Sequence, residues 1–187
     1  MAEAAVRYLR SGKALSVEAL PRPELRCVRE DERAPVDPAE FRRVLGEFAT
    51  GVTVITAPGT PPAGFACQSF SSLSLDPPLV AFMVGRASTT WPRIARAGAF
   101  CVNVLSADQD ELCRAFAVSG ADKFAGVTHD PAPASGSPRL AGTLAWIDCT
   151  IHAVHTGGDH LIVVGRVDAL GAGEGEAPLL FHRGRFL

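Results

Sequence analysis

The sequence predicts one mainly β domain, an antiparallel barrel that is closed or nearly closed, with a few short helices at its rim. At least six segments have the alternation or apolar content of strands, and Gly or Pro turns bound most of them. Only three short segments have helical spacing. Strands joined by short links favour antiparallel pairing in a meander over a doubly wound parallel sheet. The 187 residues, 47% of them apolar, are enough to bury one core.

Charge and composition exclude several classes of function. The formal net charge is −2, and no Lys/Arg patch is interleaved with aromatic residues, so nucleic acid is not an expected partner. No apolar run reaches the length of a membrane span, and the N-terminal stretch does not have the pattern of a secretory signal, so we expect a cytoplasmic protein. The five cysteines are far apart without a C-x-x-C pair, and we expect most of them to be reduced core residues.

Residues 1–36 form a predicted N-terminal extension. They are rich in Arg, Glu and Pro and lack sustained periodicity, so we expect partial order at best. A dimer arm, a tether to a partner and a disordered tail all remain open for this segment. The compact domain is expected over residues 37–187.

The first predicted helix begins after Asp37, which is a good N-cap, with Pro38 at the first helical position. Gly51 is the expected end of this helix. Four apolar residues follow at helical spacing and predict one amphipathic helix: Phe41, Val44, Leu45 and Phe48.

Strand periodicity begins at Val52. The expected strands cover residues 52–57, 64–75 and 78–85, and a short helix over 89–97 precedes a further strand at 99–106. Pro92 is tolerated in that helix because it lies in the first turn.

The second half of the domain is expected to begin with another short helix. Ser106 and Gln109 form a predicted capping box, and Leu112, Ala115 and Phe116 are the apolar residues of this helix. A loop is expected over 127–137.

Two long strands, 143–156 and 160–170, then flank the hairpin signal Gly157-Gly158-Asp159. After a Gly/Glu-rich linker, a last strand is expected over 179–186.

The segment GFACQSFSSLSLDPP, residues 64–78, is rich in short hydroxyl side chains and ends in a turn signal. Short hydroxyls can bind a phosphate or the edge of a ring without filling the space around it. The segment therefore fits a binding edge for a flat, phosphorylated cofactor, while a half-exposed Ser-rich strand explains the same pattern.

The other motifs give weaker evidence about function. The glycines of residues 171–176 lack the last position of G-x-G-x-x-G and run into Pro178, and neither a G-x-S-x-G elbow nor a Walker loop is present. Cys149 and His155 would share one face of a strand while His152 points to the other, so we expect no metal site. His160 begins a strand at a predicted barrel rim, where it could bind a ligand or simply end a hairpin.

Taken together, these segments resemble the flavin reductase-like family, short-chain NAD(P)H:flavin oxidoreductases that supply reduced flavin to two-component monooxygenases. The resemblance runs from about Phe41 to the C-terminus. Its motifs occur in the family's order: FATGVTVITA, GFACQSFSSLSLDPPLVAFMV, CVNVL, DKFAGV, GDHLIVVGRV and PLLFHRGRF.

The resemblance implies an FMN-binding split β-barrel, usually a homodimer, with the flavin at the rim near the subunit interface. It implies a catalytic role for His160, which matches the histidine placed toward the nicotinamide. The C-terminal segment from His182 would close over the site. The cofactor-binding positions that the resemblance implies are Thr53, Val54, Ile55, Thr56, Gln68, Ser69, Phe70, Ser74, Leu75, Ser88, Thr89, Asn103, Lys123, Phe124, Asp159, His160, His182, Arg183 and Phe186.

The implied reaction is hydride transfer from NADH or NADPH to FMN or FAD, which is chemistry that the cofactors carry. Reduced flavin would then diffuse to a flavin-dependent monooxygenase. Relatives often have other residues where this chain has Cys67-Gln68, so the contact with the flavin pyrimidine edge stays open. An electron carrier or sensor with tightly held FMN is the alternative, since the same barrel can serve it.

Overall fold

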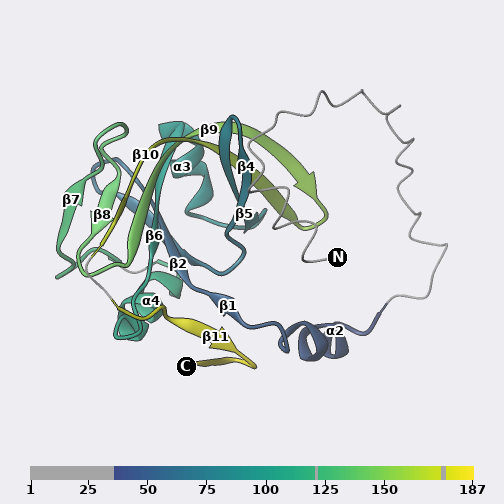
Figure 1. Ribbon diagram of the computed structural model, residues 1–187. Coiled ribbons are helices and arrows are strands. Elements are labelled where there is room, and N and C mark those ends of the chain that lie inside the picture. Colours follow the sequence, from purple (N-terminus) through teal and green to yellow (C-terminus); the bar gives the residue numbers. More distant parts are fainter. Residues whose placement is uncertain (1–35, 121, 174–175) are drawn as a thin grey trace, which may run out of the picture. The chain divides into compact units, whose positions relative to one another are not determined.

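The computed structural model describes residues 36–120, 122–173 and 176–187 (Figure 1). The chain divides into two units, Met1–Asp37 and Pro38–Leu187. The predicted extension, residues 1–36, lies almost entirely outside the described residues. The account below concerns the second unit.

Seven antiparallel strands form one large, strongly curved sheet, which confirms the predicted mainly β class (Figure 1). Along the sheet the order is β3-β2-β6-β9-β10-β5-β4. The strands are β2 (Thr53–Ala57), β3 (Ala63–Cys67), β4 (Ser71–Leu75), β5 (Pro78–Gly85), β6 (Ala99–Val104), β9 (Ala145–Gly157) and β10 (His160–Ala172).

The strand order corrects the predicted meander. β2 and β3, β4 and β5, and β9 and β10 are hairpins, but β9 and β10 lie between the two earlier hairpins. β3 and β4, which are adjacent in the sequence, therefore lie at opposite edges of the sheet. The hairpin at Gly157-Gly158-Asp159 is confirmed, with Gly157 paired to His160 and a positive φ at Gly158.

Three further segments differ from the predictions. The single strand expected over 64–75 is broken at Gln68–Phe70 into β3 and β4, because its two halves pair with different strands. Within the expected loop at 127–137, β7 (His129–Pro131) begins a small hairpin that β8 (Pro138–Leu140) completes.

The expected last strand is a hairpin of β11 (Leu180–His182) and β12 (Arg185–Phe186). It turns at Arg183 and Gly184, both with positive φ. β11 pairs with β1 (Thr50–Gly51) in a separate small sheet.

Three helices lie outside the large sheet: α2 (Pro38–Leu45), α3 (Trp91–Ala97) and α4 (Asp110–Ala117). α3 and α4 pack on its strands, and α4 buries Cys113 and Phe116, whereas the predicted Ala115 is exposed. Half of the predicted capping box forms, since the side chain of Gln109 accepts a hydrogen bond from the Ser106 amide at 3.1 Å. Within the described ranges no helix is longer than eight residues, too short to cross a membrane.

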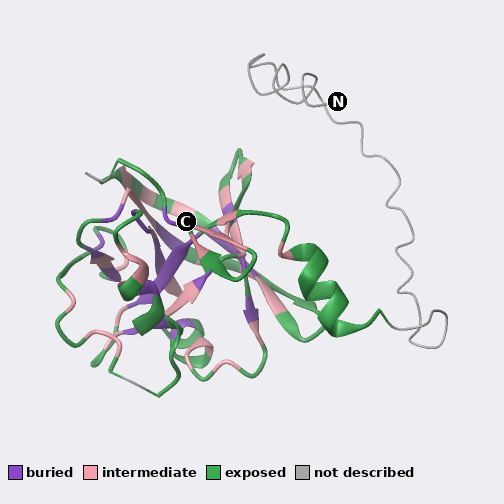
Figure 2. Ribbon diagram, turned by 90° about the horizontal axis from the view of Figure 1, so that it is seen from below, coloured by how far each residue is buried: buried purple, intermediate pink, exposed green. Residues whose placement is uncertain are grey.

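The helix α2 was predicted correctly, but its C-terminus was not. It ends at Leu45 instead of Gly51, because Gly46 and the following residues form turns. None of its residues is buried, and Figure 2 shows it exposed along its whole length. The apolar face of this amphipathic helix is open to solvent in one chain.

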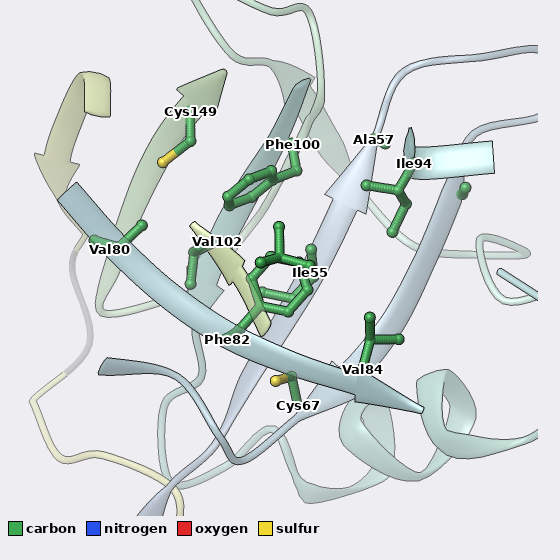
Figure 3. Close-up of a cluster of buried hydrophobic side chains, with 12 residues drawn as sticks. Ile55, Ala57, Cys67, Val80, Phe82, Val84, Ile94, Phe100, Val102 and Cys149 are labelled. Carbon is green, nitrogen blue, oxygen red and sulfur yellow. The ribbon is translucent and has the colours of Figure 1, made fainter. Parts of the chain in front are cut away.

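The barrel interior holds the main apolar core. Phe82 lies in this core and contacts Phe100 edge-on at 5.1 Å between ring centroids (Figure 3). Trp91 makes a second edge-on contact with Phe82 at 6.4 Å. Cys67 at the end of β3 and Ser69 in the link between β3 and β4 both contact Met83 of β5, which brings the two sheet edges together. A second core between β2, α4 and the C-terminal hairpin contains Leu105, Phe116 and Leu179.

Candidate active site

A pocket of about 480 Å³ opens where β3 and β5 end at the same rim of the barrel. Its walls come from five places: the end of β3 and the Gln68-Ser69 link, the end of β5, the turn before α3, the end of α4, and Lys123 with His160. The lining residues are Phe65, Ala66, Cys67, Gln68, Ser69, Met83, Val84, Gly85, Ala87, Ser88, Thr89, Thr90, Phe116, Ala117, Ser119, Lys123 and His160.

One wall is fixed by Ser69. Its hydroxyl donates a hydrogen bond to the Met83 carbonyl at 3.0 Å and accepts one from the Met83 amide at 2.9 Å. The Cys67 sulfur lies 3.3 Å from the same oxygen. The single hydroxyl proton of Ser69 is thus used within the protein, and its side chain fastens the β3–β4 link to β5.

Cys67 is a buried part of this wall. Burial raises the pKa of its thiol, so the thiol stays protonated and weakly nucleophilic at neutral pH. The neighbouring Gln68 is exposed and its side chain has no hydrogen bond within the described part of the chain. Its amide is therefore available to a ligand.

The opposite wall joins the ends of β5 and β10. Gly85 pairs with His160, and a Cβ placed on Gly85 would meet only Nε2 of His160, at 3.9 Å. Nδ1 of His160 lies 2.7 Å from a carboxylate oxygen of Asp159, and this hydrogen bond lowers the pKa of Asp159. The contact orients the imidazole and leaves Nε2 facing the space beside Gly85.

Lys123 supplies positive charge at the other end of the pocket. Its Nζ donates hydrogen bonds to the carbonyls of Phe116 and Gly64, at 2.9 and 3.2 Å, and burial lowers its pKa. Lys123 forms no ion pair within residues 36–120, 122–173 and 176–187. Nearby, the Ser88 hydroxyl accepts a hydrogen bond from the Trp91 amide and keeps its own proton for a ligand.

Six of the expected site residues line this pocket: Gln68, Ser69, Ser88, Thr89, Lys123 and His160. Asp159 does not line the pocket but forms a hydrogen bond with His160, which does. Phe124 lines a neighbouring pocket that also includes Lys123. Phe70 packs on the barrel core instead, while Ser74 and Leu75 lie on the edge strand β4.

The structure does not bring Thr53, Val54, Ile55 and Thr56 to the pocket. They belong to β2, between β3 and β6, and all four side chains are buried. Thr56 donates a hydrogen bond to the Pro138 carbonyl at 2.6 Å.

Asn103 is buried beside Thr56. Its amide nitrogen donates a hydrogen bond to the Val54 carbonyl, and its oxygen accepts one from the Leu140 amide. These polar groups join β2 and β6 to the β7–β8 hairpin.

The C-terminal residues that were expected to close over the site lie away from the pocket. Arg183 forms an ion pair with Glu47 at 2.6 Å, next to α2, and Phe186 packs under the guanidinium of Arg114. None of His182, Arg183 and Phe186 lines the pocket.

Sequence reasoning missed Met83, Gly85 and Phe116 as pocket residues. Met83 and Gly85 lie at the end of an apolar strand whose pattern indicates only burial. Phe116 appeared as a helix core residue, and the pocket uses only one part of its surface.

The rim pocket contains a lysine ammonium without an ion pair among the described residues, a glycine that leaves room in front of His160, and an oriented imidazole. Such a pocket is suited to a flat, anionic small molecule. Residues 45–187 match the flavin reductase like domain. The chain therefore belongs to the flavin reductase-like family.

Individual relatives agree with this assignment. The reductase subunit HsaB of a flavin-dependent monooxygenase from Rhodococcus jostii (strain RHA1) is 51% identical over 152 residues, which are 81% of this chain and 77% of the relative. Two solved structures share the split-barrel fold.

The first is nitrilotriacetate monooxygenase component B from Mycobacterium thermoresistibile, with a TM-score of 0.76 and 49% identity over 80% of this chain and 84% of that one. The second is the NADH:FAD oxidoreductase SgcE6 from Streptomyces globisporus C-1027 in complex with NAD and FAD fragments. It has a TM-score of 0.77 and 39% identity over 83% of this chain and 96% of that one.

Proposed function

We propose that this protein is an NAD(P)H:flavin oxidoreductase that reduces FMN or FAD and supplies the reduced flavin to a flavin-dependent monooxygenase. The rim pocket is the observation that supports this proposal. Gly85 has no side chain to fill the space in front of the Nε2 atom of His160, and the Lys123 ammonium has no ion-pair partner among the described residues. The named activities of the relatives support it.

The residues present fit a flavin. A Cβ at position 85 would project into the space before His160, so the glycine keeps room for a ring there. Lys123, Ser88 and Thr89 would hold the phosphate side, and the Gln68 amide would contact the ring edge. When bound, flavin and nicotinamide supply the hydride transfer themselves.

In this proposal the protein aligns the flavin and nicotinamide rings. The Ser69–Met83 hydrogen bonds keep one wall in place, and the Asp159–His160 contact orients the imidazole on the other. Holding two rings in reacting geometry supplies several kcal/mol of barrier reduction, on the order of the effects of proximity in enzymes. No nucleophile is required, which agrees with the protonated state of the Cys67 thiol.

The test is steady-state oxidation of NADH and of NADPH by the full chain with FMN, with FAD and without added flavin. The proposal predicts a rate that saturates with added flavin. A protein that retains yellow flavin through dialysis and shows no stimulation by added flavin would be the bound-flavin carrier instead.

The proposal includes a homodimer. Support comes from the apolar face of α2, on which Phe41, Val44 and Leu45 are 55%, 49% and 55% exposed in one chain. Phe48, beyond the helix, is 77% exposed. A second copy of this chain would remove these side chains from water.

The proposal also includes a cytoplasmic location. The four described cysteines are free thiols, as expected in a reducing compartment.

A further inference from the structure

Met83 places a thioether in the wall of the rim pocket. It is one of two methionines in the chain, it lines the pocket, and it is 42% exposed. Its neighbours along β5, Phe82 and Val84, are buried in the barrel core, so Met83 lies on the other face of this strand. A side chain so exposed is open to small solutes, and it lies next to the space that a ligand would fill.

The main chain fixes the position of Met83. The Ser69 hydroxyl is hydrogen-bonded to both its amide and its carbonyl, at 2.9 and 3.0 Å. On the other side of β5, Met83 pairs with the half-buried Ile162 of β10. The methionine side chain therefore stays part of the pocket wall, and a chemical change at its sulfur changes the wall itself.

Cys67 carries the second sulfur of this wall, and it is protected from oxidation. It is 4% exposed, and burial raises the pKa of its thiol, which keeps the thiol protonated. Oxidants react with the thiolate form of cysteine, whereas a thioether needs no deprotonation. Of the two sulfurs, that of Met83 is thus the one open to a small oxidant.

We propose that Met83 is a redox-sensitive modification site, where hydrogen peroxide oxidises the thioether to the sulfoxide and thereby weakens flavin binding in the rim pocket. An S–O bond forms as the O–O bond of the peroxide breaks. The sulfur loses two electrons, and the second peroxide oxygen leaves as water. The sulfoxide brings a polar oxygen to a place where the thioether is apolar.

The inference rests on the proposed function, which supplies the oxidant. Reduced flavin that meets O2 before it meets a monooxygenase passes two electrons and two protons to the oxygen, which gives oxidised flavin and hydrogen peroxide. Oxidation of Met83 therefore slows the reductase when its product is not consumed.

The first experiment treats the full chain with hydrogen peroxide, without a nicotinamide, and measures peptide masses and the dissociation constant of FMN. We expect one added oxygen atom on the peptide that contains Met83. The dissociation constant should rise about fivefold, because the new polar oxygen loses water when the flavin covers it. Methionine sulfoxide reductases should restore both values, whereas a thiol reductant should not.

Met83→Leu is the control, because leucine has a similar volume and no sulfur. The treated and the untreated dissociation constants are compared within each protein. Wild type should show the rise of about fivefold and Met83→Leu none, since the leucine has no thioether to oxidise. Cys67→Ala, which keeps Met83, should respond to peroxide as wild type does.

A second arm lets the protein generate the oxidant from NADH, FMN and O2, with and without catalase. We expect oxidation of Met83 that catalase prevents. If the proposed function fails, this arm leaves Met83 unmodified while added peroxide still oxidises it. The inference is overturned if added peroxide leaves Met83 unmodified, if it modifies Cys67 instead, or if oxidised Met83 leaves the dissociation constant unchanged.

Discussion

The imidazole of His160 is oriented, and its Nε2 atom faces the pocket. Two roles follow from this position: His160 places the nicotinamide, or it holds the flavin. If it places the nicotinamide, His160→Ala should lower kcat more than it weakens flavin binding, by about tenfold or more, because alignment contributes mainly to the chemical step. Steady-state kinetics and flavin titration of one preparation measure both. Equal losses would rule out this role.

The burial of Lys123 leads us to predict that flavin binding depends on pH. Burial lowers its pKa, so the ammonium loses its proton at a lower pH than an ordinary lysine. Below that pKa the charge is present and a phosphate is held; as the pH rises through it, the charge and the affinity are lost.

We therefore expect the flavin dissociation constant to rise on the alkaline side before the ordinary lysine value of about 10.4 is reached. The control is Lys123→Arg, which stays charged and should flatten the curve. Identical pH profiles for both proteins would show that Lys123 does not carry the effect.

The Ser69 hydroxyl predicts a local loss of stability. Ser69→Ala removes two hydrogen bonds to Met83, which should cost about 1 kcal/mol in the free energy of unfolding and loosen the pocket wall. Ser71→Ala is the control, because the Ser71 hydroxyl contacts only the neighbouring Ser72 carbonyl. Denaturant titration compares them, and equal stability of the two variants would contradict the assignment.

At the scale of elements, β10 needs a glycine where it crosses the barrel core. A Cβ on Gly165 would lie 2.4 Å from the Phe100 ring and 3.2 Å from the Cβ of Cys149. Gly165→Ala should therefore destabilise the protein by about 1–3 kcal/mol through overpacking. Gly51→Ala, in β1 with no atom within 4 Å of its added Cβ, should have little effect. Urea denaturation that finds both variants equal would contradict this packing.

The periodicity of the sequence predicted most elements, because strand and helix patterns are local. β5 and the β9–β10 hairpin follow the predicted runs closely. The break at Gln68–Phe70 was missed, since it depends on which distant strand each half pairs with. The C-terminal hairpin was missed because Arg183 adopts a positive φ, which its residue type does not indicate.

The candidate site shows the same division. Gln68 and His160 could be predicted from the pattern, because one lies in a segment rich in short polar side chains and the other follows a hairpin signal. Ser88 was expected only from the resemblance to the family. Thr53–Thr56 share a motif with the family, but a central strand buries them. Pocket residues from apolar elements, such as Met83 and Phe116, carry no polar signal in the sequence.

At the scale of the whole molecule, the exposed face of α2 predicts self-association. Replacing Phe41 and Phe48 by serine should convert a dimer into monomers, since each buried phenylalanine contributes about 1.5–3 kcal/mol. Light scattering with size exclusion measures the mass. Arg42→Ser, also exposed on α2, should leave the dimer intact. A monomeric wild type, or a dimeric double variant, would contradict the prediction.

The order of strands in the large sheet has a consequence for synthesis of the chain. The two early hairpins, β2–β3 and β4–β5, have no neighbour in common until β6, β9 and β10 are made. Contacts between segments so distant in sequence form slowly. A nascent chain that ends before Ala145 thus lacks β9 and β10 and leaves the edges of β5 and β6 unpaired, and such edges are prone to pair with other chains. We expect the ribosome-bound protein to depend on its last quarter, and premature termination there to yield aggregates instead of a smaller folded domain.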